Sequence, residues 1–220
     1  MVTDQDFISS LAESVDLMGL PPVSDSQLQK MAQHYNLLIK WNRRLNLTRI
    51  TEPRDAARLH YAESVFGRSL LKGAASVLDV GSGAGFPGVP LAIVDSGLSV
   101  TALESNQKKY VFLKEVKDHL ALPNFEVVNS RIQDYAWADF AALTSRALDR
   151  AESVYINLVS KLRSGQILVL YCSAPLFDTL SGSVPEGICM ERHCVPLSQN
   201  RLIALFKGNP LRHSSQVGLF

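Results

Sequence analysis

The sequence predicts an α/β fold: a seven-stranded, mostly parallel sheet covered by helices, with a helical N-terminal part. Three observations support this prediction. From residue 76 onward, short apolar segments alternate with amphipathic helical patterns, which is typical of a parallel sheet buried on both faces. A glycine-rich turn follows the first of these segments. The first 72 residues show helical periodicity only.

Three helices are expected in the N-terminal part. The first ends before Pro21-Pro22, which cannot continue a helix. Ser24 and Gln27 form a possible capping box at the start of the second. The expected helices cover residues 4–17, about 25–44 and about 55–71.

Strands and helices alternate after residue 72. Strands are predicted at residues 76–80, 98–103, 125–129, 140–144 and 166–172, and then at about 190–195 and 201–206. Helices are predicted from near Pro87, over 106–120, from Arg131 and over about 149–163. Ligands of open α/β sheets lie at the carboxyl ends of the strands, so we expect a site after the first four strands. The chain thus divides into a helical region (1–72), a sheet domain (73–207) and a flexible tail (208–220).

Length and composition restrict the function classes. The 220 residues suit one domain with a smaller lobe, and 46% of them are apolar. No apolar run approaches the ~18 residues of a membrane helix. Residues 1–20 lack the basic start of a secretion signal. We therefore expect a cytoplasmic protein without a membrane partner.

The cysteines do not show the spacing of metal ligands. They are Cys172, Cys189 and Cys194, an odd number. His193 with Cys189 and Cys194 could form half of a zinc site, but no second pair accompanies them. Reduced, packed thiols are the favoured interpretation, and we expect no metal.

The segment from Val77 to Gly88 contains the most informative motif. Asp79 lies near the end of a predicted strand, and Gly81, Gly83 and Gly85 alternate after it. Glycines accept positive φ and let a ligand lie against bare backbone. The spacing differs from G-x-G-x-x-G of dinucleotide-binding folds, and no Lys-Ser or Lys-Thr of a P-loop follows. D-x-G-x-G-x-G after a strand is typical of S-adenosylmethionine (AdoMet) methyltransferases; a turn without a ligand is the alternative.

A second acidic residue follows the second predicted strand. Glu104 ends that strand, 19 residues after Gly85. A carboxylate there can accept hydrogen bonds from both ribose hydroxyls of a nucleoside. An acid after a strand can also be a helix cap or a solvated side chain. In register with the glycine turn, we favour the ribose role.

Basic side chains concentrate around the end of the helical part, although the net charge is only +1. Residues 40–72 carry eight basic and three acidic side chains. Local positive charge is the electrostatic footprint of a polyanion, although a solvated helix face would look the same. The arginines that we expect to contact RNA phosphates are Arg43, Arg44, Arg49, Arg54 and Arg58.

Several segments together resemble one protein family. The run LDVGSGAGFPGVPLAI at residues 78–93 closely resembles the bacterial 16S ribosomal RNA guanine-N7 methyltransferase family, RsmG, also called glucose-inhibited division protein B. The other similar segments are K-W-N (40–42), N-L-T (46–48), His60 with Ser64, N-S-R (129–131) and S-R-A (145–147). The resemblance covers about residues 25–207.

The resemblance implies a fold, a reaction and a set of cofactor residues. The fold is that of class I AdoMet-dependent methyltransferases, a Rossmann-like sheet of seven strands below a helical part. The reaction transfers a methyl group from AdoMet to N7 of guanine 527 in 16S rRNA and leaves S-adenosylhomocysteine. By match, the cofactor residues fall on Gly81, Phe86, Ile132, Gln133 and Arg146.

The residue types at these positions allow more than one role. Phe86 is the first bulky residue after the glycines and could cover the cofactor or pack in the core. Ile132 could pack on the adenine ring, and Gln133 could meet its polar edge. Arg146 could bind the AdoMet carboxylate or an RNA phosphate, because a guanidinium forks onto either anion, or form a surface salt bridge.

The chain departs from the family pattern at two places. The family usually has Lys-Gly after the fifth strand, but this strand continues as Cys172, Ser173 and Ala174. A substrate contact assigned to that lysine cannot be carried over. The acid-Ser pair near the end of the helical part reads Glu63-Ser64 here.

The chemistry of guanine predicts a mechanism without a general base. N7 carries an in-plane lone pair on the major-groove edge, so no proton must leave before it attacks. The enzyme must hold N7 in line with the S–CH3 bond and present a splayed guanine. Arg146, Ser145 and His60 are the residues that we expect nearest to the transfer point.

Three other interpretations stay open at this point. The chain could methylate a small molecule, bind RNA with AdoMet as a structural ligand, or be an NAD oxidoreductase. The basic segment and the segments outside the glycine turn argue against the first. The favoured partner is 16S rRNA or the small ribosomal subunit, and we expect a monomer.

Overall fold

The computed structural model describes residues 4–146, 152–198 and 200–208, and its centre is a seven-stranded sheet. The strand order is β3-β2-β1-β4-β5-β7-β6. The first five strands are parallel, and β7 runs antiparallel to both β5 and β6. The strands are β1 Ser76–Val80, β2 Ser99–Leu103, β3 Phe125–Val128, β4 Ala142–Arg146, β5 Ile167–Ser173, β6 Ile188–Cys194 and β7 Arg201–Gly208. The predicted fold class is therefore confirmed.

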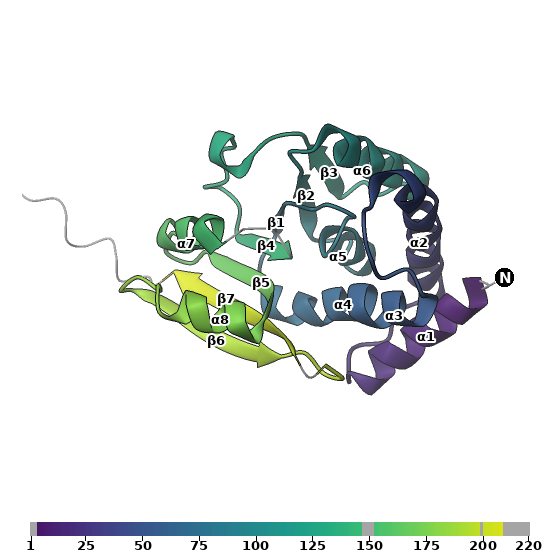
Figure 1. Cartoon of the computed structure of the whole chain (residues 1–220), viewed down its shortest axis with the longest axis horizontal. Helices are drawn as coiled ribbons and strands as arrows, with labels where there is room; N and C mark the ends of the chain where they lie inside the picture. The colour runs from purple at the N-terminus through teal and green to yellow at the C-terminus, as the bar shows by residue number, and fades with distance from the viewer. Residues whose placement is uncertain (1–3, 147–151, 199, 209–220) are drawn as a thin grey trace, which may run out of the picture.

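In Figure 1, α1 and α2 lie at the right of the molecule, whereas α4 extends toward β5 and β7. Ser24 caps α2 through the predicted capping box with Gln27. The third predicted helix begins two residues early, at Pro53, and contains a π-helical segment. The elements are α1 Asp4–Leu17, α2 Asp25–Leu45, α3 Pro53–Ala56, η1 Ala57–Ala62, α4 Glu63–Arg68 and η2 Ser69–Leu71.

The remaining helices connect the strands. They are α5 Gly88–Val94, α6 Gln107–Leu120, η3 Ile132–Asp134, α7 Glu152–Ser160 and α8 Ala174–Ser181. Helix α8 was missed by the sequence analysis, although Ser173 and Pro175 form a recognisable helix start. Residues 149–151 of the predicted seventh helix, and the predicted tail from residue 209, lie outside the described residues.

The fourth strand lies two residues later than predicted. Pairing with β1 begins at Ala142, which lies opposite Val77. Before that point, Phe140 packs against Tyr135 instead of joining the sheet. The later register carries the strand to Arg146 and so places this side chain at the carboxyl edge of the sheet.

Two hydrophobic cores cover the two faces of the sheet. Consecutive strand residues point to opposite faces, and Val77 joins one core while Leu78 joins the other. The larger core includes the N-terminal helices with α5 and α6, and the smaller one includes α7 and α8. Because both faces are buried, the strands read as continuous apolar runs.

The N-terminal helices are packed firmly on the sheet domain. Trp41 of α2 packs edge-on against Phe112 of α6, and its Nε1 donates to Glu115 at 3.1 Å. Trp41 is therefore part of this junction. Along the part of the chain that the structure covers, no helix combines the length and apolar character needed to cross a membrane.

Candidate functional site

The glycine turn joins the carboxyl end of β1 to α5. Gly81, Gly83 and Gly85 all have positive φ, of 70°, 57° and 90°. A Cβ on Gly85 would lie 2.7 Å from Cγ2 of Val89 and 3.3 Å from Nε2 of His34. At Gly85, both the conformation and the close neighbours therefore require glycine.

Asp79 ties the two ends of this turn together. It is fully buried, and its Oδ2 accepts from Ser82 Oγ at 2.5 Å and from the Gly88 backbone N–H at 3.1 Å. Its Oδ1 has no hydrogen-bond partner among the described residues. Burial raises the pKa of Asp79 to about 7, against the opposing effect of the two hydrogen bonds.

Glu104 holds the middle of the turn from the neighbouring strand. Its Oε2 accepts from the Gly83 N–H at 2.9 Å, and its Oε1 accepts from the Asn106 N–H at 2.7 Å. A carboxylate oxygen has two lone pairs, so each can accept one further hydrogen bond. The expected ribose contact is thus compatible with the bonds that Glu104 already makes.

A cavity of about 300 Å³ opens beside this turn, at the ends of β1, β2 and β3. Its size falls at the lower end of small-ligand pockets. Leu103 and Ile132 contribute apolar walls, and Gly81 contributes bare backbone. The full lining is Val80, Gly81, Leu103, Ser105, Ser130, Arg131, Ile132, Gln133 and Val154. We call it the glycine-turn cavity. Its apolar walls and glycine backbone fit a nucleoside such as that of AdoMet.

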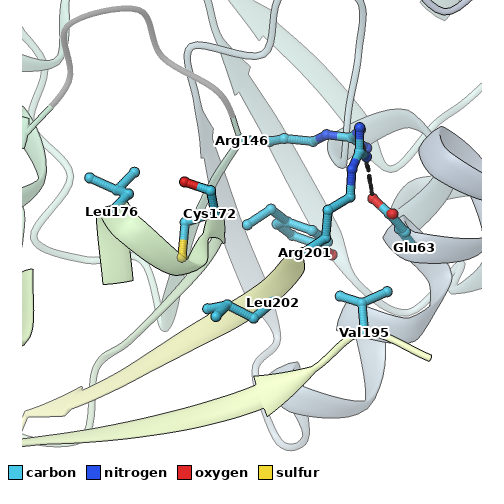
Figure 2. A pocket seen from close by; sticks show the side chains of 9 residues that line it. Glu63, Arg146, Cys172, Leu176, Val195, Arg201 and Leu202 are labelled. Atoms are coloured by element: carbon cyan, nitrogen blue, oxygen red, sulfur yellow. Dashed lines mark hydrogen bonds and ion pairs between the residues drawn. The ribbon is translucent and has the colours of Figure 1, made fainter. Parts of the chain in front are cut away.

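A second cavity, also of about 300 Å³, lies at the ends of β4 and β5. Figure 2 shows Glu63 and Arg146 at one side of it and Cys172 and Leu176 at the other. Its lining is Glu63, Arg146, Tyr171, Cys172, Ser173, Leu176, Val195, Arg201 and Leu202. We call it the Glu63 cavity.

Charged side chains from three separate elements meet in the Glu63 cavity. Glu63 of α4 is only 3% exposed, and its Oε2 lies 2.8 Å from Nη1 of Arg201 on β7. The same oxygen lies 3.7 Å from Nη2 of Arg146 at the end of β4. Burial raises the pKa of Glu63, and the two arginines oppose this rise.

Arg146 is held by the helical part. Its Nη2 donates to the Leu59 carbonyl at 2.7 Å and lies 3.0 Å from Nδ1 of His60. Burial and the neighbouring cations lower the pKa of His60 to about 2, so the imidazole is neutral. Nδ1 must then accept from Arg146, and Nε2–H donates to Thr48 Oγ1 at 2.8 Å.

Ser145 and Phe86 are both buried and contact other residues of the protein. Ser145 is fully buried, and its Oγ donates to the Val80 carbonyl at 2.8 Å. The Phe86 ring stacks on His60 at 4.5 Å and is 6% exposed. Both residues position their neighbours, and of the expected transfer-point group only Arg146 lines the second cavity.

A hydrogen-bond chain links the helical part to the glycine turn. Burial lowers the pKa of His34 to about 3, so this side chain is neutral. Its Nε2 lies 3.1 Å from the Ala84 carbonyl and its Nδ1 lies 2.9 Å from the Tyr61 hydroxyl. Nε2–H therefore donates to the turn, and Nδ1 accepts from Tyr61. The sequence analysis missed both residues, because an apolar helix face with one histidine gives no sign of this contact.

The expected RNA-contacting arginines gather around the carboxyl end of α2 and the segment after it. Arg43, Arg44, Arg49 and Arg54 are exposed. Arg58 is partly buried and pairs with Asp55 at 3.5 Å. The four exposed guanidinium groups are therefore the ones free to meet an anionic partner.

The cysteines and His193 do not form a metal centre. Cys189 and Cys194 are exposed on β6, so the expectation of packed thiols is wrong for these two, and His193 lies 3.3 Å from Glu191. Within residues 4–146, 152–198 and 200–208, no group of three or more His, Cys, Asp or Glu side chains could hold a metal ion.

Comparison with known proteins identifies close similarity to one family. The family model described as "rRNA small subunit methyltransferase G" (GidB) matches residues 27–181. A relative of that name from Solibacter usitatus is 41% identical over 154 residues, which cover 68% of this chain and 72% of the relative. Another from Chromobacterium violaceum is 33% identical over 188 residues, covering 79% and 89%.

Solved structures show the same fold at low sequence identity. A methyltransferase from Pyrococcus furiosus is 16% identical, with a TM-score of 0.60 over 82% of this chain and 98% of its own. An O-methyltransferase from Bacillus cereus, solved with S-adenosylhomocysteine, is 14% identical, with a TM-score of 0.58 over 93% and 100%. These likenesses concern the arrangement of strands and helices.

Proposed function

The chain belongs to the rRNA small subunit methyltransferase G family, and from this premise we propose that it methylates N7 of guanine 527 in 16S rRNA with AdoMet. The observation that carries the proposal is the glycine-turn cavity, which lies at the same edge of the sheet as a second, charged cavity. One cavity suits a nucleoside cofactor, and the other suits a base.

We infer that AdoMet binds in the glycine-turn cavity. The backbone of Gly81, Gly83 and Gly85 would lie against its amino-acid end, within the turn that Asp79 fixes. Glu104 would accept from the ribose hydroxyls, and Ile132 with Gln133 would hold the adenine. Phe86 and Arg146 would support the cofactor site indirectly. The Phe86 ring packs on His60, and the Arg146 guanidinium donates to the Leu59 carbonyl. When bound, AdoMet supplies an electrophilic methyl group on its sulfonium.

The residues at the transfer point would act by position alone. Guanine N7 needs no deprotonation, and burial lowers the pKa of His60 to about 2. A group that stays neutral above pH 3 gives no titration near pH 7. We therefore expect no general base to titrate in the chemical step between about pH 6 and 8, as proximity catalysis requires; the pKa of about 7 at Asp79 concerns the stability of the glycine turn.

RNA would dock over the helical part. Arg43, Arg44, Arg49 and Arg54 provide exposed positive charge at one end of α2. Arg58, although paired with Asp55, lies on the following helical segment. We propose that these arginines bind phosphates of the rRNA, that the protein acts as a monomer in the cytoplasm, and that it needs no metal.

The test is methyl transfer from labelled AdoMet to 16S rRNA and to small ribosomal subunits. Both substrates should come from cells that lack this protein, so that the target guanine is unmodified. Chemical cleavage at N7-methylguanosine then maps the product. We expect one new cleavage site at guanine 527; transfer to another base, or to small molecules only, contradicts the proposal.

A further inference from the structure

Two polar atoms beside the Glu63 cavity lack a partner. Oε1 of Glu63 and Nη1 of Arg146 are buried, and neither makes a hydrogen bond to any residue that the structure describes. Both side chains line the cavity. Buried polar atoms are almost always hydrogen-bonded, and leaving one unpaired costs about 1 to 3 kcal/mol. The two side chains lie close together, with Oε2 and Nη2 3.7 Å apart, and an unpaired donor and acceptor on such a pair indicate a ligand that supplies their complements.

The neighbours of these side chains fix which atoms remain open. Nη2 of Arg146 is already used by the Leu59 carbonyl and His60 Nδ1, whereas Nη1 has no partner among the described residues. Oε2 of Glu63 is already used by Arg201 at 2.8 Å, so Oε1 is the free oxygen. The two residues that line the cavity therefore keep one unpaired donor, on Arg146, and one unpaired acceptor, on Glu63, among the described residues.

The position of the cavity suits the base that receives the methyl group. Arg146 directly follows Ser145, which lies opposite Val80 in the sheet. Val80 and Gly81 line the glycine-turn cavity, so the two cavities lie at the ends of the neighbouring strands β1 and β4. Tyr171, Leu176, Val195 and Leu202 give the Glu63 cavity apolar walls against which a flat ring can lie.

Resting on the proposed function, we propose that the Glu63 cavity holds the target guanine and that Glu63 and Arg146 read its Watson–Crick edge. Glu63 Oε1 accepts from N1–H, and Arg146 Nη1 donates to O6. Guanine presents this donor beside this acceptor, whereas adenine presents N1 as acceptor beside its N6 amino donor. The same pair therefore selects guanine and rejects adenine. N7, on the other side of O6, stays free to face the methyl group.

Arg201 is the positioning residue of this arrangement. It lies on β7 directly opposite Ser173, at the end of β5. This is the strand end at which the chain has no lysine. The guanidinium of Arg201 thus supplies positive charge there from a neighbouring strand and holds Oε2 of Glu63. Its side chain is 35% exposed, so it can also lie near the phosphate of the bound nucleotide.

The experiment replaces the target base in an rRNA substrate assembled by ligation. Guanine is compared with inosine, O6-methylguanine and 2,6-diaminopurine, all of which keep N7. Inosine keeps N1–H and O6, so we expect kcat/KM within about threefold of guanine. The other two lose the N1–H donor, and diaminopurine adds an amino group at C6. We expect at least about a hundredfold loss for both, since a site built for a hydrogen bond rejects an analogue without it.

The second arm uses Glu63→Gln with Glu13→Gln as an exposed control. A glutamine amide can turn its NH2 group to the N1 acceptor of diaminopurine. The preference for guanine over diaminopurine should then fall at least about tenfold in Glu63→Gln and stay unchanged in the control. The Kd for S-adenosylhomocysteine should stay within about twofold, which also shows that the variant is folded.

The outcomes separate this inference from the proposed function. If wild-type protein methylates guanine and diaminopurine equally well, the edge-reading role is wrong while the methyltransferase function stands. A tenfold weaker Kd for S-adenosylhomocysteine in folded Glu63→Gln would assign the pair to the cofactor and also overturn the inference. If no rRNA guanine is methylated, both proposals fail. Should Glu63→Gln not fold, the base series with wild-type protein decides alone.

Discussion

The two cavities at the carboxyl edge of the sheet are built in different ways. The glycine-turn cavity borders on a turn shaped by backbone: three glycines with positive φ, held by Asp79 and Glu104, of which Gly81 lines the cavity. The Glu63 cavity takes its chemistry from side chains on α4, β4 and β7, which are 83 and 55 positions apart in the chain. The glycine turn lies within one continuous segment, whereas the Glu63 cavity forms only when three distant elements come together.

This difference has a consequence for how each cavity responds to substitution. A backbone site is damaged by adding atoms or by changing permitted φ angles. A side-chain site is damaged by removing one member of a hydrogen-bonded group, because its partner is then left buried and unpaired. The four predictions below use this contrast, beginning with the largest expected effect.

The largest effect is expected from Gly85→Ala. The new Cβ would meet Val89 Cγ2 at 2.7 Å, at a φ of +90°. Backbone strain of about 1 to 2 kcal/mol and overpacking of about 1 to 3 kcal/mol should lower the free energy of unfolding by roughly 2 to 5 kcal/mol in total. Urea unfolding and titration with S-adenosylhomocysteine measure this effect, and binding should be lost.

Gly83→Ala is the matched control for that change. Its φ of +57° lies in the left-handed helical region, and the nearest heavy atom to its Cβ is the Gly81 carbonyl oxygen at 3.7 Å. Only strain of about 1 to 2 kcal/mol should follow. If Gly85→Ala and Gly83→Ala lowered the unfolding free energy equally, the contact with Val89 would not be the reason why position 85 requires glycine.

The second effect concerns the dependence of stability on pH through Asp79. The folded-state pKa of about 7 lies above the ordinary value of 3.8, so the folded protein holds a proton that the unfolded chain releases. This contribution is fully present below pH 4 and is lost as pH rises to 7. At 1.36 kcal/mol per unit, the loss amounts to at most about 4 kcal/mol.

Asp79→Asn removes this titration while keeping an oxygen for Ser82 and Gly88. Relative to wild type, the variant should therefore gain about 2 to 3 kcal/mol of unfolding free energy between pH 5 and pH 8. Urea unfolding at the two pH values measures the difference. A difference that does not change with pH would mean that Asp79 titrates normally.

The third effect, from Tyr61→Phe, should change cofactor binding in the glycine-turn cavity and leave base recognition in the Glu63 cavity unchanged. Loss of the hydroxyl leaves Nδ1 of His34 buried and unpaired, which should cost about 1 to 2 kcal/mol of unfolding free energy. Because His34 bonds to the Ala84 carbonyl, binding of S-adenosylhomocysteine should weaken severalfold. The preference for guanine over diaminopurine should stay unchanged. A changed base preference with unchanged S-adenosylhomocysteine binding would mean that Tyr61 and His34 act on the base site and not on the cofactor site.

The smallest effect per residue is expected on the RNA-docking surface. Replacing Arg43 or Arg44 by Gln should weaken rRNA binding a few-fold and reduce the slope of log K against log salt concentration by about 0.7 to 0.9 for each phosphate that is no longer neutralised. Filter binding over a range of KCl concentrations gives this slope. Lys30→Gln, on the same helix but earlier, is the control and should leave the slope unchanged. All three variants should bind S-adenosylhomocysteine with the wild-type Kd.

Much of the fold and half of the site could be predicted from local patterns. The strand β1 and the helix α1 lie where the sequence places them, because periodicity and helix breakers act over a few residues. The turn glycines and Glu104 were found because their spacing is a local property. Strand β4 was predicted two residues early, since its start depends on pairing with β1 and not on its own residues.

The sequence by itself determined the alternating α/β order, the glycine turn and the family to which the chain belongs. These depend on spacing within short segments, where bond geometry and side-chain volume leave few choices. Only the tertiary structure decided that Glu63 meets Arg146 and Arg201, and that Tyr61 reaches the glycine turn through His34. These contacts join residues far apart in the chain, and burial at a shared edge of the sheet gives them their chemistry.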